Sequence, residues 1–249
     1  MNKFAWLLMA ATAFAAEPDW RTVEDRALEL LVKYVRMQTV NPPANTRAAA
    51  EMFRAELEAV GLKPTLYTSG PDGQTNLVVR MAGRDRSKKP LLLLNHFDVV
   101  PVDRKAWSMD PFAALIKDGV IWGRGTLDMK GIGVQQLTAL IELKKAGITP
   151  ARDIVMLVTA DEETNGVRGI RWMLENHPAE IDCEYVLDEG GMGTRDVLAV
   201  NKLVFGVAVG EKQLMWLRLK ARGTAGHGSQ PIANNANLIL LEAVRKALA

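Results

Sequence analysis

The sequence contains one cysteine, three histidines and no excess of charge of either sign. Its 249 residues include 31 Lys or Arg and 29 Asp or Glu, a net charge of +2. The basic residues are interspersed with acidic ones, which gives no case for a nucleic-acid partner. Cys183 cannot form an internal disulfide, and its place before an apolar run favours buried packing over a nucleophilic role. With 48% hydrophobic and 24% charged residues, the composition is that of an ordinary globular protein. Beyond residue 16 no apolar run is long enough to cross a membrane.

The first sixteen residues have a different pattern. Lys3 precedes the apolar stretch Phe4–Phe14, and Ala13-Phe14-Ala15 fits the small-x-small rule for signal-peptide cleavage. A membrane anchor or a first core helix are the alternatives. The abrupt change to polar residues at 17–19 favours export. We therefore expect a cleaved signal peptide at 1–16 and a periplasmic or secreted protein that does not stay in the membrane.

Helices and strands are predicted to alternate along the rest of the chain. Apolar residues at helical spacing predict amphipathic helices, and short β-branched or leucine-rich runs predict buried strands. This alternation indicates an α/β fold with a mostly parallel sheet flanked by helices at 17–205, followed by the start of an α+β domain at 206–249. The predicted helices are 19–38, 45–60, 131–145, 167–176 and one from 234; the strands are 66–68, 77–81, 91–95, 154–159, 185–187, 205–209 and 214–219, with a hairpin at 115–122.

Acidic residues follow several of these strands, at the edge where parallel α/β sheets bind ligands. His96 and Asp98 stand two apart where the strand from Leu91 ends, so their side chains point to one face and Asp98 suits the orientation of a metal-binding histidine. The alternatives to a metal site are that His96 is an ordinary core histidine and that the acids cap helices. Several carboxylates at one edge repel each other unless a cation lies among them, which favours a metal site. The candidates are His96, Asp98, Asp128, Glu162, Glu163, Asp188 and Glu189, whereas Asp161 is interpreted as a cap or a loop hydrogen-bond acceptor.

Five motifs in chain order resemble the co-catalytic zinc exopeptidases that include aminoacylase, carboxypeptidase S and bacterial glutamate carboxypeptidase. The resemblance covers most of residues 19–249 and implies the fold and activity of that family. The motifs are His96-x-Asp98-Val-Val-Pro101, Trp107-Ser-x-x-Pro111-Phe112, Asp118-Gly119, Gly123-Arg124-Gly125-x-x-Asp128-Met129-Lys130-Gly131 and Asp161-Glu162-Glu163.

The resemblance implies a role for each candidate residue. His96 would bind one zinc ion, Asp128 would bridge two, and Glu163 would bind the second. Asp98 would orient His96, and Glu162 would be the general base for the attacking water. Asp188 would be a further ligand of the first zinc, with Glu189 as the alternative. His227 would donate to the oxyanion across a dimer interface. The resemblance also implies a cis peptide at Asp128–Met129.

The resemblance also implies partners and exposes one departure. The substrate would be a small peptide or an N-acyl amino acid, the protein a homodimer through its second domain, and the cofactor two Zn²⁺, with Co²⁺ or Mn²⁺ also accepted by such ligands. The family carries a last zinc-binding histidine far downstream, and no histidine follows His227. We therefore expect the N-terminal part of a longer hydrolase, which alone binds zinc poorly and is inactive. The alternatives are a related dizinc aminopeptidase and a non-catalytic binding protein of the same fold.

Overall fold

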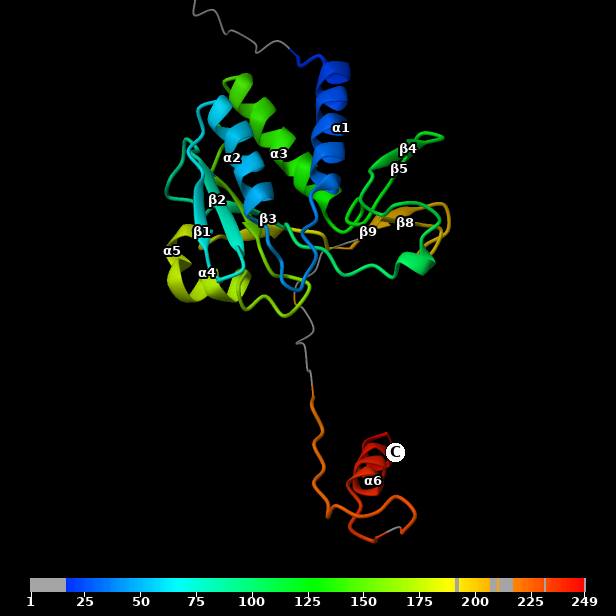
Figure 1. Ribbon diagram of the computed structural model, residues 1–249. Helices are drawn as coiled ribbons and strands as arrows, with labels where there is room; N and C mark the ends of the chain where they lie inside the picture. Colours follow the sequence, from blue (N-terminus) through cyan, green and yellow to red (C-terminus); the bar gives the residue numbers. More distant parts are fainter. Residues whose placement is uncertain (1–16, 191–192, 207–209, 211–216, 231, 249) are drawn as a thin grey trace, which may run out of the picture. The chain divides into compact units, whose positions relative to one another are not determined.

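The computed structural model describes residues 17–190, 193–206, 210, 217–230 and 232–248 (Figure 1). The chain forms two compact units, 1–190 and 191–249, and each is described by itself. The predicted signal peptide at 1–16 lies outside the described residues. Within the described residues, no helix combines the length and the apolar character that a membrane crossing requires.

The first unit is built on a five-stranded sheet of order β1-β2-β6-β3-β7. β3 runs parallel to β6 and β7, whereas β2 runs antiparallel to β1 and β6, so only β2 opposes the other strands. The α/β class with a mostly parallel sheet is therefore confirmed. The strands are β1 (Thr65–Thr68), β2 (Thr75–Met81), β3 (Leu91–His96), β6 (Ile154–Thr159) and β7 (Tyr185–Leu187).

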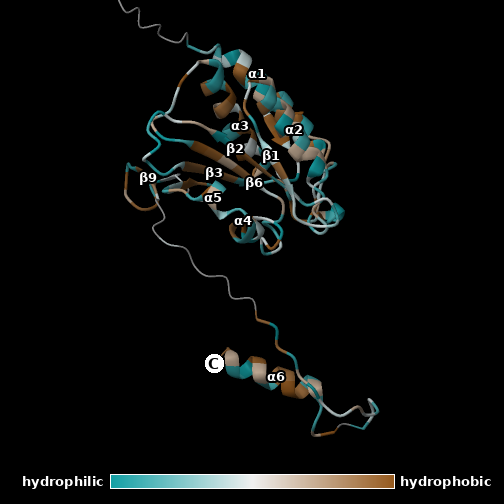
Figure 2. Ribbon diagram, turned by 90° about the vertical axis from the view of Figure 1, so that its left-hand side faces the viewer, coloured by the Kyte–Doolittle hydropathy of each residue, from teal (hydrophilic) through white to brown (hydrophobic). Residues whose placement is uncertain are grey.

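Helices cover both faces of this sheet (Figures 1 and 2). Successive strand residues point to opposite faces, so Leu77 and Val79 pack with the helices of one layer, whereas Val78 packs with Met173 and Ile181 of the other. The first layer contains α1 (Trp20–Arg36), α2 (Arg47–Ala59) and α3 (Lys130–Lys145); the second contains α4 (Ile170–Asn176) and the short α5 (Pro178–Ile181).

An aromatic cluster fixes the end of β3 against the first layer. Phe97 is fully buried, and its ring centroid lies 5.3 Å from that of Phe53 on α2 and 6.2 Å from that of Tyr34 on α1. Edge-on contacts of this kind add to the stabilisation that burial of the rings provides. Because Phe97 points into this core, His96 and Asp98 on either side of it point the other way.

The first unit differs from the sequence prediction in some of its shorter elements. The helix predicted at 167–176 begins at Ile170, because the preceding turns, with Gly166 at φ +65°, hold residues 162–169 in a loop. α5 was not predicted. The hairpin was, and it forms from β4 (Leu115–Lys117) and β5 (Val120–Trp122), while a single 3₁₀ turn, η1, spans Arg104–Ala106.

The second unit contains a hairpin and one helix in its described residues. β8 (Gly193–Arg195) pairs antiparallel with β9 (Leu203–Phe205), and α6 (Ala236–Ala247) confirms the helix predicted from 234. The strand predicted at 205–209 falls mostly outside the described residues, as does that at 214–219. The described part 217–219 is not a strand, because it has no hydrogen-bonded neighbour among the described residues. The domain boundary at 205 stays a prediction, and the compact units divide earlier, after Gly190.

Candidate metal centre

The carboxyl ends of β3, β6 and β7 bring one histidine and several carboxylates together. His96 is the last residue of β3, Glu162 and Glu163 follow β6, and Glu189 follows β7. These strands are parallel neighbours, so their ends meet at one edge of the sheet. Asp128 arrives from the turn before α3, and the predicted cis peptide at Asp128–Met129 is present.

His96 is turned so that one ring nitrogen faces its support and the other faces the carboxylates. The residue is 2% exposed. Nδ1 lies 2.9 Å from the Asp98 carbonyl oxygen and 3.4 Å from Asp98 Oδ1. Nε2 lies 3.2 Å from Asp128 Oδ1, 3.6 Å from Glu189 Oε2 and 3.9 Å from Glu162 Oε2. A core histidine does not need three acids around its second nitrogen, so this arrangement favours the metal-site interpretation.

Two groups of side chains present ligand atoms that lie within 4.8 Å of one another. The first is His96, Asp128 and Glu163, and the second is His96, Glu162 and Glu189. An imidazole nitrogen with carboxylate oxygens is a donor set that suits zinc and related divalent cations. The cluster of acids around one nitrogen therefore fits a divalent cation.

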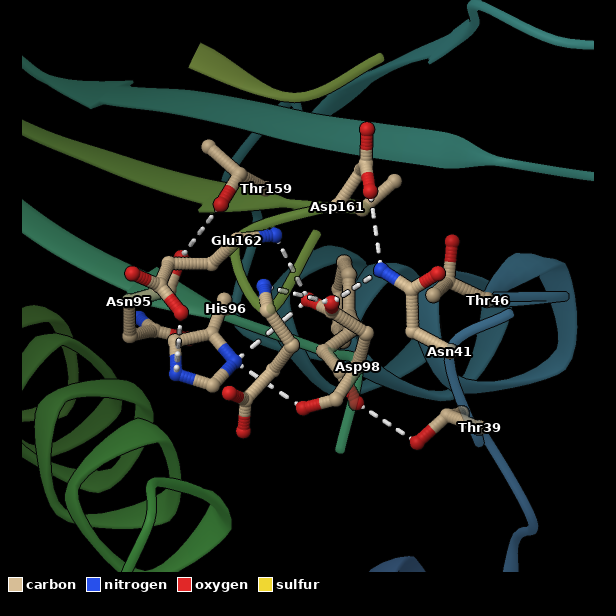
Figure 3. A network of polar contacts seen from close by, with 12 residues as sticks. Thr39, Asn41, Thr46, Asn95, His96, Asp98, Thr159, Asp161 and Glu162 are labelled. Carbon is tan, nitrogen blue, oxygen red and sulfur yellow. Dashed lines mark hydrogen bonds and ion pairs between the residues drawn. The ribbon is translucent and has the colours of Figure 1, made fainter. Parts of the chain in front are cut away.

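Asp98 lies behind His96, as predicted, and has a second set of partners. Its side chain is fully buried. Oδ1 accepts the backbone N–H of Glu162 at 3.0 Å (Figure 3). Oδ2 accepts that of Glu163, also at 3.0 Å. One carboxylate therefore supports both His96 and the loop that carries the two glutamates.

The structure brings together most, but not all, of the residues proposed from the sequence. The Asp188 carboxylate accepts the N–H of Gly190 at 2.8 Å and belongs to neither ligand group. Glu189, one residue on, faces His96, so the geometry favours Glu189 over Asp188 as the ligand from this strand end. His227 belongs to the second unit, where its Nδ1 lies 2.8 Å from Ser229 Oγ, and its part in the site stays a prediction.

Sequence reasoning missed one buried polar residue behind the site. Asn41, which precedes two prolines, is 4% exposed and donates to both Asp98 and Asp161. Asp161 also accepts the backbone N–H of Arg168 at 2.9 Å, which confirms its interpretation as a loop acceptor. The sequence around Asn41 contains no pattern that identifies Asp98 or Asp161 as its partner.

The packed acids shift each other's pKa values. Burial disfavours protonation of His96, but the carboxylates of Asp128, Asp98 and Glu189 outweigh it and raise the histidine's pKa to about 12. Burial, followed by the charge of Asp128, raises the pKa of Glu163 to about 7. Burial also raises the pKa of Glu162; the charge of His96 opposes this shift, and the nearby carboxylates add to it. The metal-free centre therefore holds protons near neutral pH where a cation would sit.

We expect zinc affinity to fall as the pH is lowered, and to fall more steeply below pH 7. Binding must displace the proton of His96 at any pH near neutral and, below about 7, also that of Glu163. Zinc titration in two buffers of different ionisation enthalpy measures the protons released, and an affinity independent of pH would contradict the expectation.

The stability of the metal-free protein should change with pH in the other direction, because Glu163 stabilises the fold while it is protonated. The folded state keeps a proton that the unfolded state releases, so stability falls as the pH rises from 4.5 towards about 7.

The sequence matches one protein family and several curated relatives. The profile of "Peptidase family M20/M25/M40" matches residues 92–249. Pig aminoacylase-1 is 32% identical over 231 residues, which cover 92% of this chain and 55% of that protein. The human N-fatty-acyl-amino acid synthase/hydrolase PM20D1 is 36% identical over 165 residues, covering 66% of this chain and 33% of that protein. The chain thus spans about half the length of the aminoacylases it matches.

Solved structures share the fold of the chain. An M20 family metallo-carboxypeptidase, Sso-CP2 from Sulfolobus solfataricus, superposes with a TM-score of 0.57 at 26% identity, over 67% of this chain and 37% of that one. Human carnosine dipeptidase 1 gives a TM-score of 0.54 at 22% identity, over 68% of this chain and 40% of that one, a likeness of fold alone. The α/β arrangement around the centre is therefore one that solved proteins also adopt.

Proposed function

The chain belongs to peptidase family M20/M25/M40, and from that premise we propose that it carries the metal centre of a hydrolase that cleaves an amide bond in an N-acyl amino acid or a small peptide. The observation that carries the proposal is His96 Nε2, which faces the carboxylates of Asp128, Glu162 and Glu189. The relatives support the substrate class, because one is named an aminoacylase and another a hydrolase of N-fatty-acyl amino acids.

We propose His96, Asp128, Glu163 and Glu189 as the residues that hold two Zn²⁺ ions. Bound there, a divalent cation supplies Lewis-acid polarisation of the scissile carbonyl and lowers the pKa of water. The protein contributes the rest. Asp98 engages His96 Nδ1, which leaves Nε2 directed at the acids, and the orientation of a ligating histidine by such a partner is a general feature of metal sites.

We propose Glu162 as the general base. Its backbone is fixed by Asp98, whereas its side chain remains half exposed at the open edge of the centre. The pKa of this carboxylate is raised towards neutral pH, and a general base is most efficient when its pKa lies near the working pH. Glu162 would take a proton from the attacking water and deliver it to the leaving nitrogen. His227 is proposed as a donor to the oxyanion, supplied by the other subunit of a homodimer.

A panel of three substrates tests this function. We expect hydrolysis of an N-acetyl amino acid with a free carboxylate, and little or none when that carboxylate is amidated. Cleavage only of a peptide amide with a free α-amino group would replace the proposal with an aminopeptidase. Absence of hydrolysis by the zinc-loaded whole protein would favour the non-catalytic binding protein.

Export and dimerisation are part of the proposal. Residues 1–16 are proposed as the signal peptide that directs the protein to the periplasm or the exterior. The intact mass of the protein from its native source tests this, because cleavage removes that segment. Sedimentation of the whole protein tests the homodimer, and a monomer active at all concentrations would contradict the role given to His227.

A further inference from the structure

Asn41 lies between two segments that carry the metal centre. Its backbone is attached to the end of β3: the N–H of Asn41 donates to the Val99 carbonyl at 2.9 Å, and Val40 forms a parallel bridge with Val99. The neighbouring Thr39 hydroxyl donates to the Phe97 carbonyl at 2.6 Å. The segment 39–41 is therefore joined to the backbone on both sides of Asp98.

The side chain of Asn41 reaches from there to the loop after β6 (Figure 3). Nδ2 lies 2.7 Å from Asp98 Oδ2 and 2.8 Å from Asp161 Oδ1, and the Thr164 hydroxyl lies 3.2 Å from Asn41 Oδ1. One amide nitrogen thus uses both of its hydrogens to bridge two carboxylates that are 0% and 6% exposed. The two acids belong to different strand ends, and the amide is the direct link between them.

An amide is well suited to this position. Buried carboxylates need hydrogen-bond donors and repel each other when they share a site. The asparagine amide is neutral, offers two donors on one nitrogen and accepts at its oxygen. Aspartate at 41 would offer acceptors only, and alanine would leave both carboxylates short of a donor.

The two acids that Asn41 joins define where Glu162 and Glu163 lie. Asp98 accepts the backbone N–H groups of both glutamates, and Asp161 precedes them directly and accepts the N–H of Arg168. Asn41 itself belongs to neither ligand group. Its hydrogen bonds nevertheless set the position of the loop relative to His96.

We propose that Asn41 is a positioning residue of the metal centre: its amide clamps Asp98 to Asp161 and so holds the Glu162–Glu163 loop against the end of β3, with the ligand set arranged before a cation binds. The identification of the ligands as a metal centre rests on the proposed function, whereas the clamp itself is a feature of the hydrogen-bond geometry. Substitution of Asn41 should therefore change metal affinity without removing a ligand.

The test is the zinc dissociation constant, measured by competition with a chromophoric chelator, of the wild-type chain and three variants shown to be folded by circular dichroism. Asn41→Ala should bind zinc about tenfold or more weakly, the range found when supports of metal ligands are lost. Asn41→Asp should also bind more weakly, although its added negative charge alone would tighten binding. Thr46→Val is the matched control, because it removes a buried hydroxyl that bonds only the Thr75 backbone.

The outcomes separate this inference from the proposed function. Unchanged affinity in Asn41→Ala, tighter binding in Asn41→Asp, or an equal loss in Thr46→Val would overturn the positioning role while leaving the metal centre intact. A wild-type chain that binds no zinc would overturn both. If Asn41→Ala does not fold, Asn41→Ser keeps one donor and should show a smaller loss in the same direction, and unchanged affinity there would overturn the role equally.

Discussion

In the whole protein, replacement of Glu162 with glutamine is expected to lower the turnover of N-acyl amino acids by about 10²–10⁴-fold, the contribution typical of a general base, while the bound metal is retained. The amide of glutamine has nearly the same shape but cannot take a proton from water. The backbone N–H of residue 162 still donates to Asp98, so the loop keeps its support. Turnover number and metal content measured on the same preparation check the expectation.

Glu175→Gln is the matched control for this variant. Glu175 lies exposed on α4 and belongs to neither ligand group, so its replacement should leave turnover and metal content unchanged. Full activity in Glu162→Gln would exclude Glu162 as the base. Loss of metal together with activity would instead make Glu162 a ligand, which its membership of the second ligand group allows as a contrary result.

Replacement of Asp98 with alanine is expected to cost about 3–5 kcal/mol of stability, as the loss of one partner of a buried ion pair typically does. The change leaves three donors without their acceptor: the backbone N–H groups of Glu162 and Glu163 and the Asn41 amide. His96 Nδ1 keeps the backbone carbonyl of residue 98 but loses the carboxylate that lies 3.4 Å away. Since His96 then loses the carboxylate beside Nδ1 and the Glu162–Glu163 loop loses its acceptor, zinc affinity should fall as well, by about 10–100-fold. Urea unfolding of the metal-free protein and a zinc titration measure the two effects.

Asp85→Ala controls for the loss of a carboxylate as such. Asp85 is partly exposed, accepts hydrogen bonds from Ser87 and pairs with Lys88 at 3.5 Å, both close by in the sequence. We expect little change in the unfolding midpoint or in zinc affinity. An Asp98→Ala protein as stable as the wild type, with unaltered zinc affinity, would contradict the role of Asp98 as the support of the centre.

The sequence was sufficient to predict the sheet and the edge at which the acids gather. Leucine-rich and β-branched runs indicate buried strands. Because the carboxyl ends of parallel strands lie at the same edge of a sheet, His96 and Glu163 could be placed together from the sequence alone. It was not sufficient to choose between Asp188 and Glu189. β7 is only three residues long, and over so short a strand the alternation of faces does not show which acid turns towards His96.

Long-range polar contacts were the part that sequence patterns could not predict. Asn41 and Asp161 are 120 residues apart. The two prolines after Asn41 indicate only that the preceding helix ends there, so the local sequence does not point to a buried contact. Lys130 is a similar case. A lysine at the start of a helix is ordinarily solvated, yet this one is buried, donates to the carbonyls of Tyr34 and Met37 at the end of α1, and has its pKa lowered to about 7 by burial.

Zinc binding by the purified chain and by its His96→Ala variant is the most direct test of the metal centre. His96 is the residue common to both ligand groups, and its Nε2 is the atom on which the acids converge. We expect the wild-type chain to bind zinc weakly, and His96→Ala to lose this binding while it remains folded. Equal zinc binding by the two proteins, or none by the wild type, would contradict the identification of this edge of the sheet as a metal centre.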